Sequence, residues 1–253
     1  MLLKFKNLVG LFLTSKPAEL LLDCLRIRNV MVEGLRFDVT NPRVKTSSRG
    51  ALFFGFYESA ERRSLAMIEF EGDVVELGSS IGVVSCLIRR RMKKAARLLC
   101  VEADIELATI AGGNLVLNGL ADNSTICNAA VVGVPMASVQ FVRGSISTTG
   151  GIVRGQLGPA SITIPAYTID QIREKLSIER YSLVCDIEGE EWNLVSENSP
   201  VLVGCVLLLI EVHMKPGVDS TPEEAFLRFT NILRPTFTLL RRDGFVGTYR
   251  RKL

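Results

Sequence analysis

The sequence predicts an α/β protein with a mostly parallel sheet that ends in an antiparallel hairpin. From about residue 74 onward, short apolar and β-branched runs alternate with segments of helical spacing. The apolar run Val201–Ile210 is about half as long as a membrane-spanning helix and is typical of a buried strand. Asp243-Gly244 lies between two apolar runs, which is a strong hairpin signal. A chain of 253 residues, 47% of them hydrophobic, is long enough for one large domain.

The first part of the chain is predicted to be an extension. Residues 1–45 begin with an apolar, helix-like stretch, and Asn41-Pro42 and residues 46–50 mark loops. Residues 54–68 have helical spacing and lead toward the first strand. We therefore expect a helical N-terminal extension over residues 1–45 and a single domain over residues 46–253.

Strands and helices then alternate along the chain. Strand 74–77 is followed by a helix at 83–96, strand 98–101 by a helix at 105–117, and a third strand is expected at 124–132.

Residues 137–166 depart from this alternation, because β-branched residues are interleaved with many Ser, Thr and Gly. This pattern predicts a β-rich insertion. Beyond it, the sequence predicts helices at 169–176, 191–197 and 222–233 and strands at 182–187, 202–211, 236–240 and 245–249.

Charge and cysteine usage narrow the classes of function. The formal net charge of +3 is too small to indicate nucleic-acid binding, and the basic clusters at 89–97 and 250–252 are typical of solvated surface. No two of the six cysteines are spaced as C-x-x-C, so the sequence predicts neither a zinc motif nor a disulfide framework. We expect a reducing, cytoplasmic location. The cysteines are at positions 24, 86, 100, 127, 185 and 205.

The N-terminal stretch is predicted to be an amphipathic helix. Its apolar run Leu8–Leu13 contains a glycine, is short for a signal sequence and is followed by no A-x-A-like cleavage site. Such a helix can pack on the domain, on a second copy of the chain in a homodimer, or on a membrane surface as a peripheral contact. No transmembrane segment is expected.

A glycine turn follows the first predicted strand, in the sequence VVELGSSIG. Where a dinucleotide-binding turn has a second glycine, this chain has Ser80, whose side chain hinders close approach of a pyrophosphate. Glu76 would repel a pyrophosphate but attract a cationic amino-acid head group or a sulfonium. Together with Gly78 and Gly82, these residues predict a site for S-adenosylmethionine (SAM). The alternative is a plain α/β domain with a tight turn.

The next strand supplies an acidic residue at its end. Glu102 lies 20 residues after Gly82, where a carboxylate that binds both ribose hydroxyls is expected. Asp104 is a candidate to line the adenosine site, and Asn128 a candidate to meet the adenine edge, although an ordinary loop amide explains Asn128 equally well.

Four stretches resemble the FkbM-type SAM-dependent methyltransferases, a family that mostly methylates oxygen. Order and spacing agree over about residues 50–215. The four stretches are GFYE with Glu61, similar to the lead-in "YE..E"; GDVVELGSSIG, similar to "GdvvvDvGAniG"; VCDIEGEE, similar to "KIDVEGaE"; and IEVH, similar to "vEiH".

The resemblance implies a Rossmann-like class I methyltransferase fold with a seven-stranded sheet, and a small-molecule acceptor such as a sugar, a lipid or another metabolite. It also implies that Tyr57 and Glu58 close the cofactor pocket. The chain departs from the family pattern at Glu76, which replaces Asp, and at the serines that replace Ala and Asn in the turn. Val184 replaces a lysine, so no role of that lysine carries over.

The acceptor site is expected where two further predicted strands end. Methyl transfer to a hydroxyl needs the acceptor oxygen in line with the carbon–sulfur bond and a group that takes its proton. The candidate catalytic residues are Asp186, Glu188 and His213, and Glu211 is expected to orient a neighbour. His213 has an ordinary pKa suited to a base, but a surface or loop-anchoring role is equally compatible with the sequence. Asp186 can also cap the helix that follows it.

No metal ligand set is predicted, although Asp186, Glu188 and His213 could form an oxygen-rich site. Two other functions stay open. A nicotinamide-dependent oxidoreductase would use a similar sheet, but Ser80 argues against it. A non-catalytic protein that binds SAM, or nothing, is compatible with Val184 and the serine-containing turn.

Overall fold

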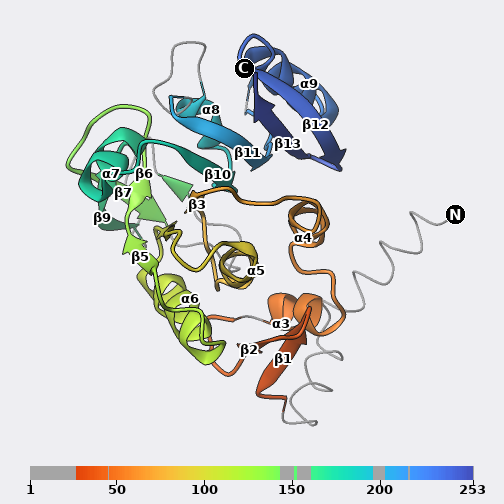
Figure 1. Ribbon diagram of the computed structural model, residues 1–253, viewed down its shortest axis with the longest axis vertical. Coiled ribbons are helices and arrows are strands. Elements are labelled where there is room, and N and C mark those ends of the chain that lie inside the picture. The colour runs from red at the N-terminus through yellow and green to blue at the C-terminus, as the bar shows by residue number, and fades with distance from the viewer. Residues whose placement is uncertain are drawn as a thin grey trace, which may run out of the picture.

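The computed structural model describes residues 27–44, 46–142, 151–152, 161–195, 203–215 and 217–252. Its centre is a seven-stranded sheet in the order β12-β13-β11-β10-β3-β4-β5 (Figure 1). The strands from β5 to β11 pair in parallel, and β13 pairs antiparallel with both β11 and β12. This arrangement confirms the predicted Rossmann-like α/β fold, a mostly parallel seven-stranded sheet with a C-terminal antiparallel hairpin. The strands are β3 (Asp73–Leu77), β4 (Leu98–Glu102), β5 (Ser124–Asn128), β10 (Tyr181–Cys185), β11 (Cys205–Glu211), β12 (Phe237–Asp243) and β13 (Val246–Arg251).

Helices cover both faces of this sheet. Side chains alternate between the faces, so Val74 packs in one hydrophobic core and its neighbour Val75 in the other. The first core contains helices α3 (Thr46–Phe53), α4 (Ser59–Leu65), α5 (Val83–Arg91) and α6 (Ile105–Leu117). The second contains α7 (Ile169–Leu176), α8 (Glu191–Leu194) and α9 (Pro222–Leu233). The domain is therefore a three-layer sandwich.

Local sequence sets where the helices begin. Thr168 and Gln171 form a reciprocal capping box at the start of α7. Thr221 caps α9 through the backbone N–H of Glu224, with Pro222 at the first helical position. The bounds of α7 and α9 are those predicted from the sequence.

The segment before the domain is partly built into it. The helix expected at its start lies outside the described residues. Its later part forms a hairpin of β1 (Asn29–Val32) and β2 (Leu35–Asp38), whose Val32 and Phe37 are buried in the core shared with α5 and α6. A division at residue 45 therefore does not separate this hairpin from the domain core.

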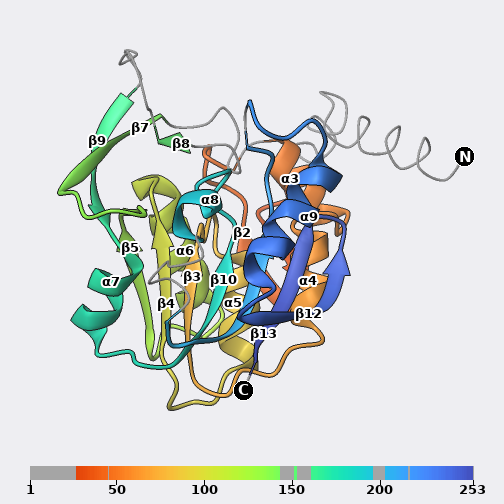
Figure 2. The same cartoon turned by 90° about the horizontal axis from the view of Figure 1, so that it is seen from above.

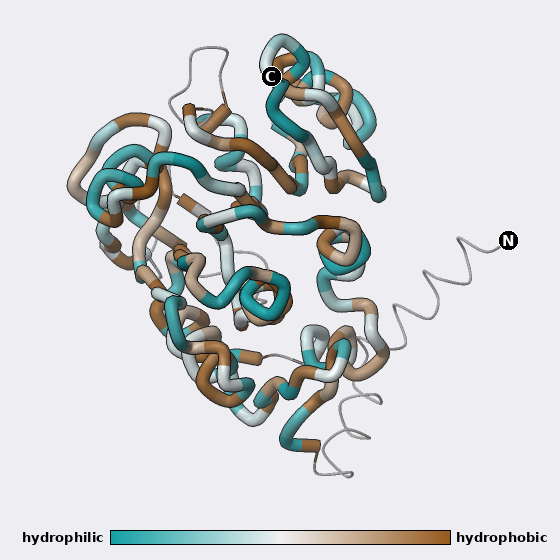
Figure 3. Tube along the Cα trace, in the orientation of Figure 1, coloured by the Kyte–Doolittle hydropathy of each residue, from teal (hydrophilic) through white to brown (hydrophobic). Residues whose placement is uncertain are grey.

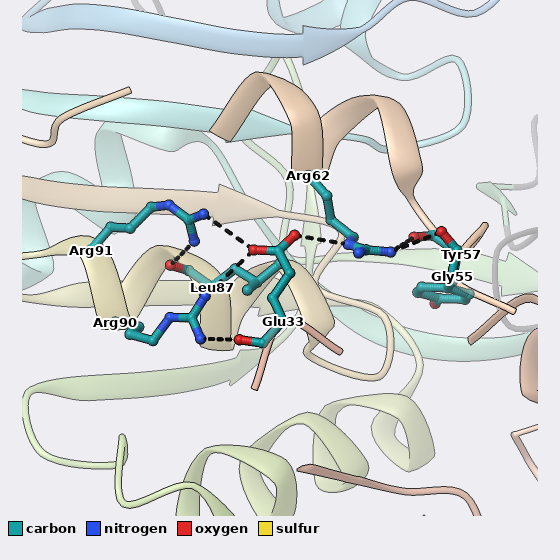
Figure 4. A network of polar contacts seen from close by, with 7 residues as sticks. All are labelled: Glu33, Gly55, Tyr57, Arg62, Leu87, Arg90 and Arg91. Atoms are coloured by element: carbon teal, nitrogen blue, oxygen red, sulfur yellow. Dashed lines mark hydrogen bonds and ion pairs between the residues drawn. The ribbon is translucent and has the colours of Figure 1, made fainter. Parts of the chain in front are cut away.

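An ionic cluster holds the hairpin turn against two helices. Glu33 has left-handed backbone geometry, and its carboxylate pairs with Arg62 at 3.2 Å, Arg90 at 3.4 Å and Arg91 at 3.2 Å. Figure 4 shows the three guanidinium groups converging on this one side chain. Arg90 also donates to the Glu33 carbonyl. Part of the basic cluster expected to be solvated surface thus anchors the hairpin to α4 and α5.

Several predicted elements differ from the structure. The helix expected at 83–96 ends at Arg91. The helix expected over residues 54–68 is limited to α4, and a second helix, α3, occupies the expected loop at 46–50. Gly55 and Glu58 have positive φ values of 77° and 44°, which no continuous right-handed helix can contain. The strand expected over 124–132 is split into β5 and β6 (Ala130–Val131), because β6 leaves the large sheet to pair with β9.

A second, small sheet lies within residues 130–167, in the order β6-β9-β7-β8. Its further strands are β7 (Ser138–Val142), β8 (Gly151–Ile152) and β9 (Ser161–Tyr167). In Figure 2, β7 and β9 project at the upper left, beyond the strands of the large sheet. The predicted β-rich segment at 137–166 corresponds to most of this sheet.

The outer edge of the large sheet is β12, which is exposed from Thr238 to Arg242. Its trace changes from hydrophobic to hydrophilic toward the end of the strand (Figure 3). Charged residues on an edge strand discourage pairing with another chain. Within the described part of the chain, no helix combines the length and apolar character needed to cross a bilayer.

Candidate functional site

The candidate site lies where β3, β4, β10 and β11 end. These parallel strands have their carboxyl ends at one edge of the sheet. The chain runs outward from β3 through β4 to β5, and then returns to the other side of β3 as β10. Ligands of open α/β sheets bind at such a switch point, beyond the strand ends.

The glycine turn after β3 is packed tightly at this point. Gly78 has φ +83°, and an added Cβ would overlap the carbonyl oxygen of Asp186 after β10. Gly82 has φ +82°, and an added Cβ would lie 2.8 Å from the Ala111 Cα in α6. The structure therefore explains why both positions are glycine. Gly78 is approached closely by the residue that follows β10, and Gly82 packs against helix α6.

Ser80 joins the turn to residues distant in sequence. It has φ +48°, its N–H donates to Glu102 Oε2 at 2.8 Å, and its Oγ lies 3.0 Å from the Tyr57 hydroxyl. Tyr57 is buried and precedes α4. The structure thus brings together three predicted cofactor residues, Tyr57, Ser80 and Glu102.

Glu102 is oriented by backbone donors. Its second oxygen, Oε1, accepts the N–H of Asp104 at 2.9 Å. Burial raises the pKa of Glu102, and the N–H groups of Asp104 and Ser80 oppose that rise. Each carboxylate oxygen has two lone pairs, so this group can accept further hydrogen bonds from ribose hydroxyls.

Asp104 and Asn128 stabilise the loop around Glu102. The Asp104 side chain caps α6 through the N–H of Glu106 and pairs with Arg43 at 2.5 Å. Asn128 donates its Nδ2 to the carbonyl oxygens of Glu102 and Ala103, both at 2.9 Å. Both predicted residues therefore have a structural role, and the adenine contact suggested for Asn128 stays a prediction.

Glu76 lies behind the turn, inside the core. It is 1% exposed and accepts a hydrogen bond from Ser85 Oγ at 2.5 Å, while its Oε1 has no hydrogen-bond partner among the residues that the structure describes. Burial raises the pKa of Glu76 to about 7, against the opposing hydrogen bond from Ser85. Its charge can act on a ligand at the turn, but its direct partner is α5.

A second acidic group lies on the α4 side of the site. The enclosed Oε2 of Glu58 has no hydrogen-bond partner in the described part of the chain. Burial, then the charges of Glu61, Asp186 and Glu76, raise the Glu58 pKa well above the ordinary value. Glu211, at the end of β11, is hydrogen-bonded to Glu61; burial and this bond raise the Glu211 pKa to about 9.

His213 links the ends of β10 and β11. Its Nδ1 lies 3.1 Å from Glu191 Oε1, and its Nε2 lies 3.8 Å from Asp186 Oδ1 and 3.6 Å from Glu188 Oε2. All three carboxylates therefore pair with the same residue, His213. Glu191 is fully buried and also accepts the backbone N–H of His213 at 2.6 Å.

These contacts change the proton affinity of the acceptor-site candidates. Burial lowers the pKa of His213, but the bond to Glu191 and the neighbouring carboxylates outweigh it and raise the pKa to about 10. Burial raises the pKa of Asp186 to about 7 despite the opposing charge of His213, and burial also raises the pKa of Glu188. The ordinary histidine pKa assumed from the sequence does not apply, because His213 is protonated near neutral pH in this arrangement.

Three residues of the site were not among the predicted site residues. Glu61 and Glu191 lie within two of the motifs that resemble the family, but the motifs alone assign them no role. Arg43 lies in the segment expected to be outside the domain, 61 positions before its partner Asp104. No sequence pattern near Arg43 indicates that contact.

The sequence matches no known family profile, and no curated protein sequence is similar to it. Solved structures with a similar fold include a candidate rRNA methylase from Clostridium thermocellum, at 8% identity and TM-score 0.46, over 78% of this chain and 95% of that chain. A candidate O-methyltransferase from Klebsiella pneumoniae has 15% identity and TM-score 0.42, over 78% and 80% of the two chains. An O-methyltransferase from Bacillus cereus, solved with S-adenosylhomocysteine, has 13% identity and TM-score 0.41, over 76% and 79%.

Proposed function

We propose that this chain is a SAM-dependent methyltransferase of the FkbM type that methylates a hydroxyl group of a small molecule such as a sugar or a lipid. The observation that carries the proposal is the position of Glu102. It ends the strand next to the glycine turn and is held by the N–H groups of Ser80 and Asp104. A fixed carboxylate beside a turn without phosphate-binding glycines suits a ribose that carries no pyrophosphate.

The charges around the turn support a cationic cofactor. Asp186, Glu188 and Glu191 share His213 as their cationic partner. Glu58 and Glu76 each have a buried oxygen that makes no hydrogen bond with the residues described here. Negative charge at the strand ends attracts a sulfonium and an ammonium and repels phosphates. The residues present therefore fit SAM better than a dinucleotide.

SAM, when bound, supplies a methyl group on a cationic sulfur, which leaves as a neutral thioether with the electron pair of the broken bond. The chain has to hold the acceptor oxygen in line with that bond and accept the hydroxyl proton. Asp186, Glu188 and His213 are our candidates for these tasks, since they gather at the ends of β10 and β11. Because three carboxylates surround His213 and favour its protonated form, a carboxylate is the better proton acceptor.

Ligand-induced thermal stabilisation tests the proposal. SAM and S-adenosylhomocysteine should each raise the melting temperature, while NAD should not. A ligand at 100 times its dissociation constant contributes about 2.7 kcal/mol to the free energy of unfolding. Stabilisation by NAD alone would favour an oxidoreductase. No stabilisation by the adenosyl ligands would favour a non-catalytic protein on the same fold.

A further inference from the structure

We infer that Asp186, Glu211 and His213 form a binding site for one divalent metal ion of the Mn²⁺ class. One ligand atom from each residue lies within 4.8 Å of the others. Atoms that share an ion at about 2.1 Å lie within about 4.2 Å of one another, so small side-chain rotations suffice. The three residues come from the ends of two adjacent parallel strands, β10 and β11.

The donor set defines the class of ion. Two carboxylates suit Mg²⁺, Ca²⁺ and Mn²⁺, whereas an imidazole suits first-row transition metals. Mn²⁺ satisfies both preferences. Three protein ligands also leave positions open for water or for an acceptor oxygen.

The orientation of His213 is an independent indication of a metal ligand. The buried carboxylate of Glu191 holds its Nδ1 at 3.1 Å and its backbone N–H at 2.6 Å, and the indole of Trp192 donates to its carbonyl oxygen at 2.8 Å. These contacts fix the ring and direct Nε2 toward Asp186. A metal ion bound there would take the place of the Nε2 proton, which is released to solvent. Histidines that bind metals are oriented by such carboxylates on their other nitrogen.

Asp186 provides a second indication. Its side chain is 26% exposed, but its Oδ1 is enclosed, makes no hydrogen bond with any described residue, and points toward His213 Nε2 at 3.8 Å. An enclosed carboxylate oxygen without a hydrogen bond carries a desolvation cost that a bound cation would offset. Glu211, for its part, is held by Glu61.

The use of the ion rests on the proposed function. A cation at this position would bind the acceptor oxygen and favour loss of its proton. Glu188 is not one of the three proposed ligands, and its carboxylate lies 3.6 Å from His213 Nε2. It is then the residue available to take the proton of the acceptor hydroxyl.

Titration with Mn²⁺ alone tests the site. The full chain, treated with EDTA and dialysed, is titrated with MnCl₂, and free Mn²⁺ is measured by electron paramagnetic resonance. We expect one bound ion per chain. Glu211→Gln and Asp186→Asn should each weaken binding by at least about tenfold, since even an outer partner of a metal ligand contributes that much. Glu174→Gln, an exposed carboxylate on α7, serves as the matched control and should bind as the wild type does.

Two results would overturn the inference: no bound Mn²⁺ up to about 1 mM, the weak end of protein sites for divalent ions, or unchanged binding by both folded variants. SAM binding is measured separately in EDTA by calorimetry. Mn²⁺ binding without SAM binding would remove the proposed function and leave the metal site. The reverse result would remove the metal site alone.

Discussion

At the scale of single residues, Gly78 connects the fold to the candidate site. Its backbone is left-handed, and its missing side chain lets the carbonyl of Asp186 approach the turn. The same approach places the end of β10, with its acidic residues, beside the expected methyl donor. The absence of a side chain at Gly78 thus allows the end of β10 to lie close to the glycine turn.

Gly78→Ala should destabilise the protein by about 2–5 kcal/mol, since left-handed geometry costs an L-residue about 1–2 kcal/mol and overpacking about 1–3 kcal/mol. Urea unfolding measures the change. Gly72→Ala is the matched control, because no atom lies within 4 Å of its added Cβ. Equal loss of stability in the two variants would contradict the close approach of Asp186.

At the scale of elements, the N-terminal hairpin belongs to the domain. Asn114 of α6 is 1% exposed; its Oδ1 accepts the N–H of Asp38 at 3.0 Å, and its Nδ2 donates to the carbonyl of Ile81 at 2.8 Å. One side chain therefore connects β2, the glycine turn and α6. Arg43, which follows the hairpin, reaches Asp104 near the predicted ribose site.

Asn114→Ala should lower the free energy of unfolding by about 2–4 kcal/mol, because it leaves two backbone groups without partners at about 1–3 kcal/mol each. Chemical denaturation compares it with Asn231→Ala, an exposed position on α9 that should change stability by no more than about 0.5 kcal/mol. A loss as small as that of the control would show that the hairpin is not tied to the core through Asn114.

At the scale of the whole molecule, the order of strands and helices could be predicted because each is a local pattern. Strand 98–101 and helix 105–117 agree with β4 and α6 to within a residue, and Asp243-Gly244 marks the terminal hairpin. The break at Gly55 was harder to foresee, since a positive φ leaves no periodic signal. The contacts of the site depend on pairs such as Glu61 and Glu211, which only the folded sheet brings together.

Sequence patterns also predict only part of the chemistry of the site. Glu102 could be predicted from its distance to the glycine turn, because strand and helix lengths fix that spacing. The raised pKa of His213 could not, since it depends on Glu191 and on two strand ends that meet in the fold. Sequence patterns predict which residue types reach the site, while the folded environment sets their protonation.

The most direct test of the account is a calorimetric titration with S-adenosylhomocysteine of the wild type, Glu102→Ala and the control Glu174→Ala. The account predicts binding by the wild type and the control, and at least about tenfold weaker binding by a folded Glu102→Ala. A single hydrogen bond to a charged group contributes about 1.5–3 kcal/mol, and 1.4 kcal/mol is about tenfold in affinity. Equal affinity in all three proteins would contradict the ribose site at Glu102, and no binding by the wild type would contradict the proposed cofactor itself.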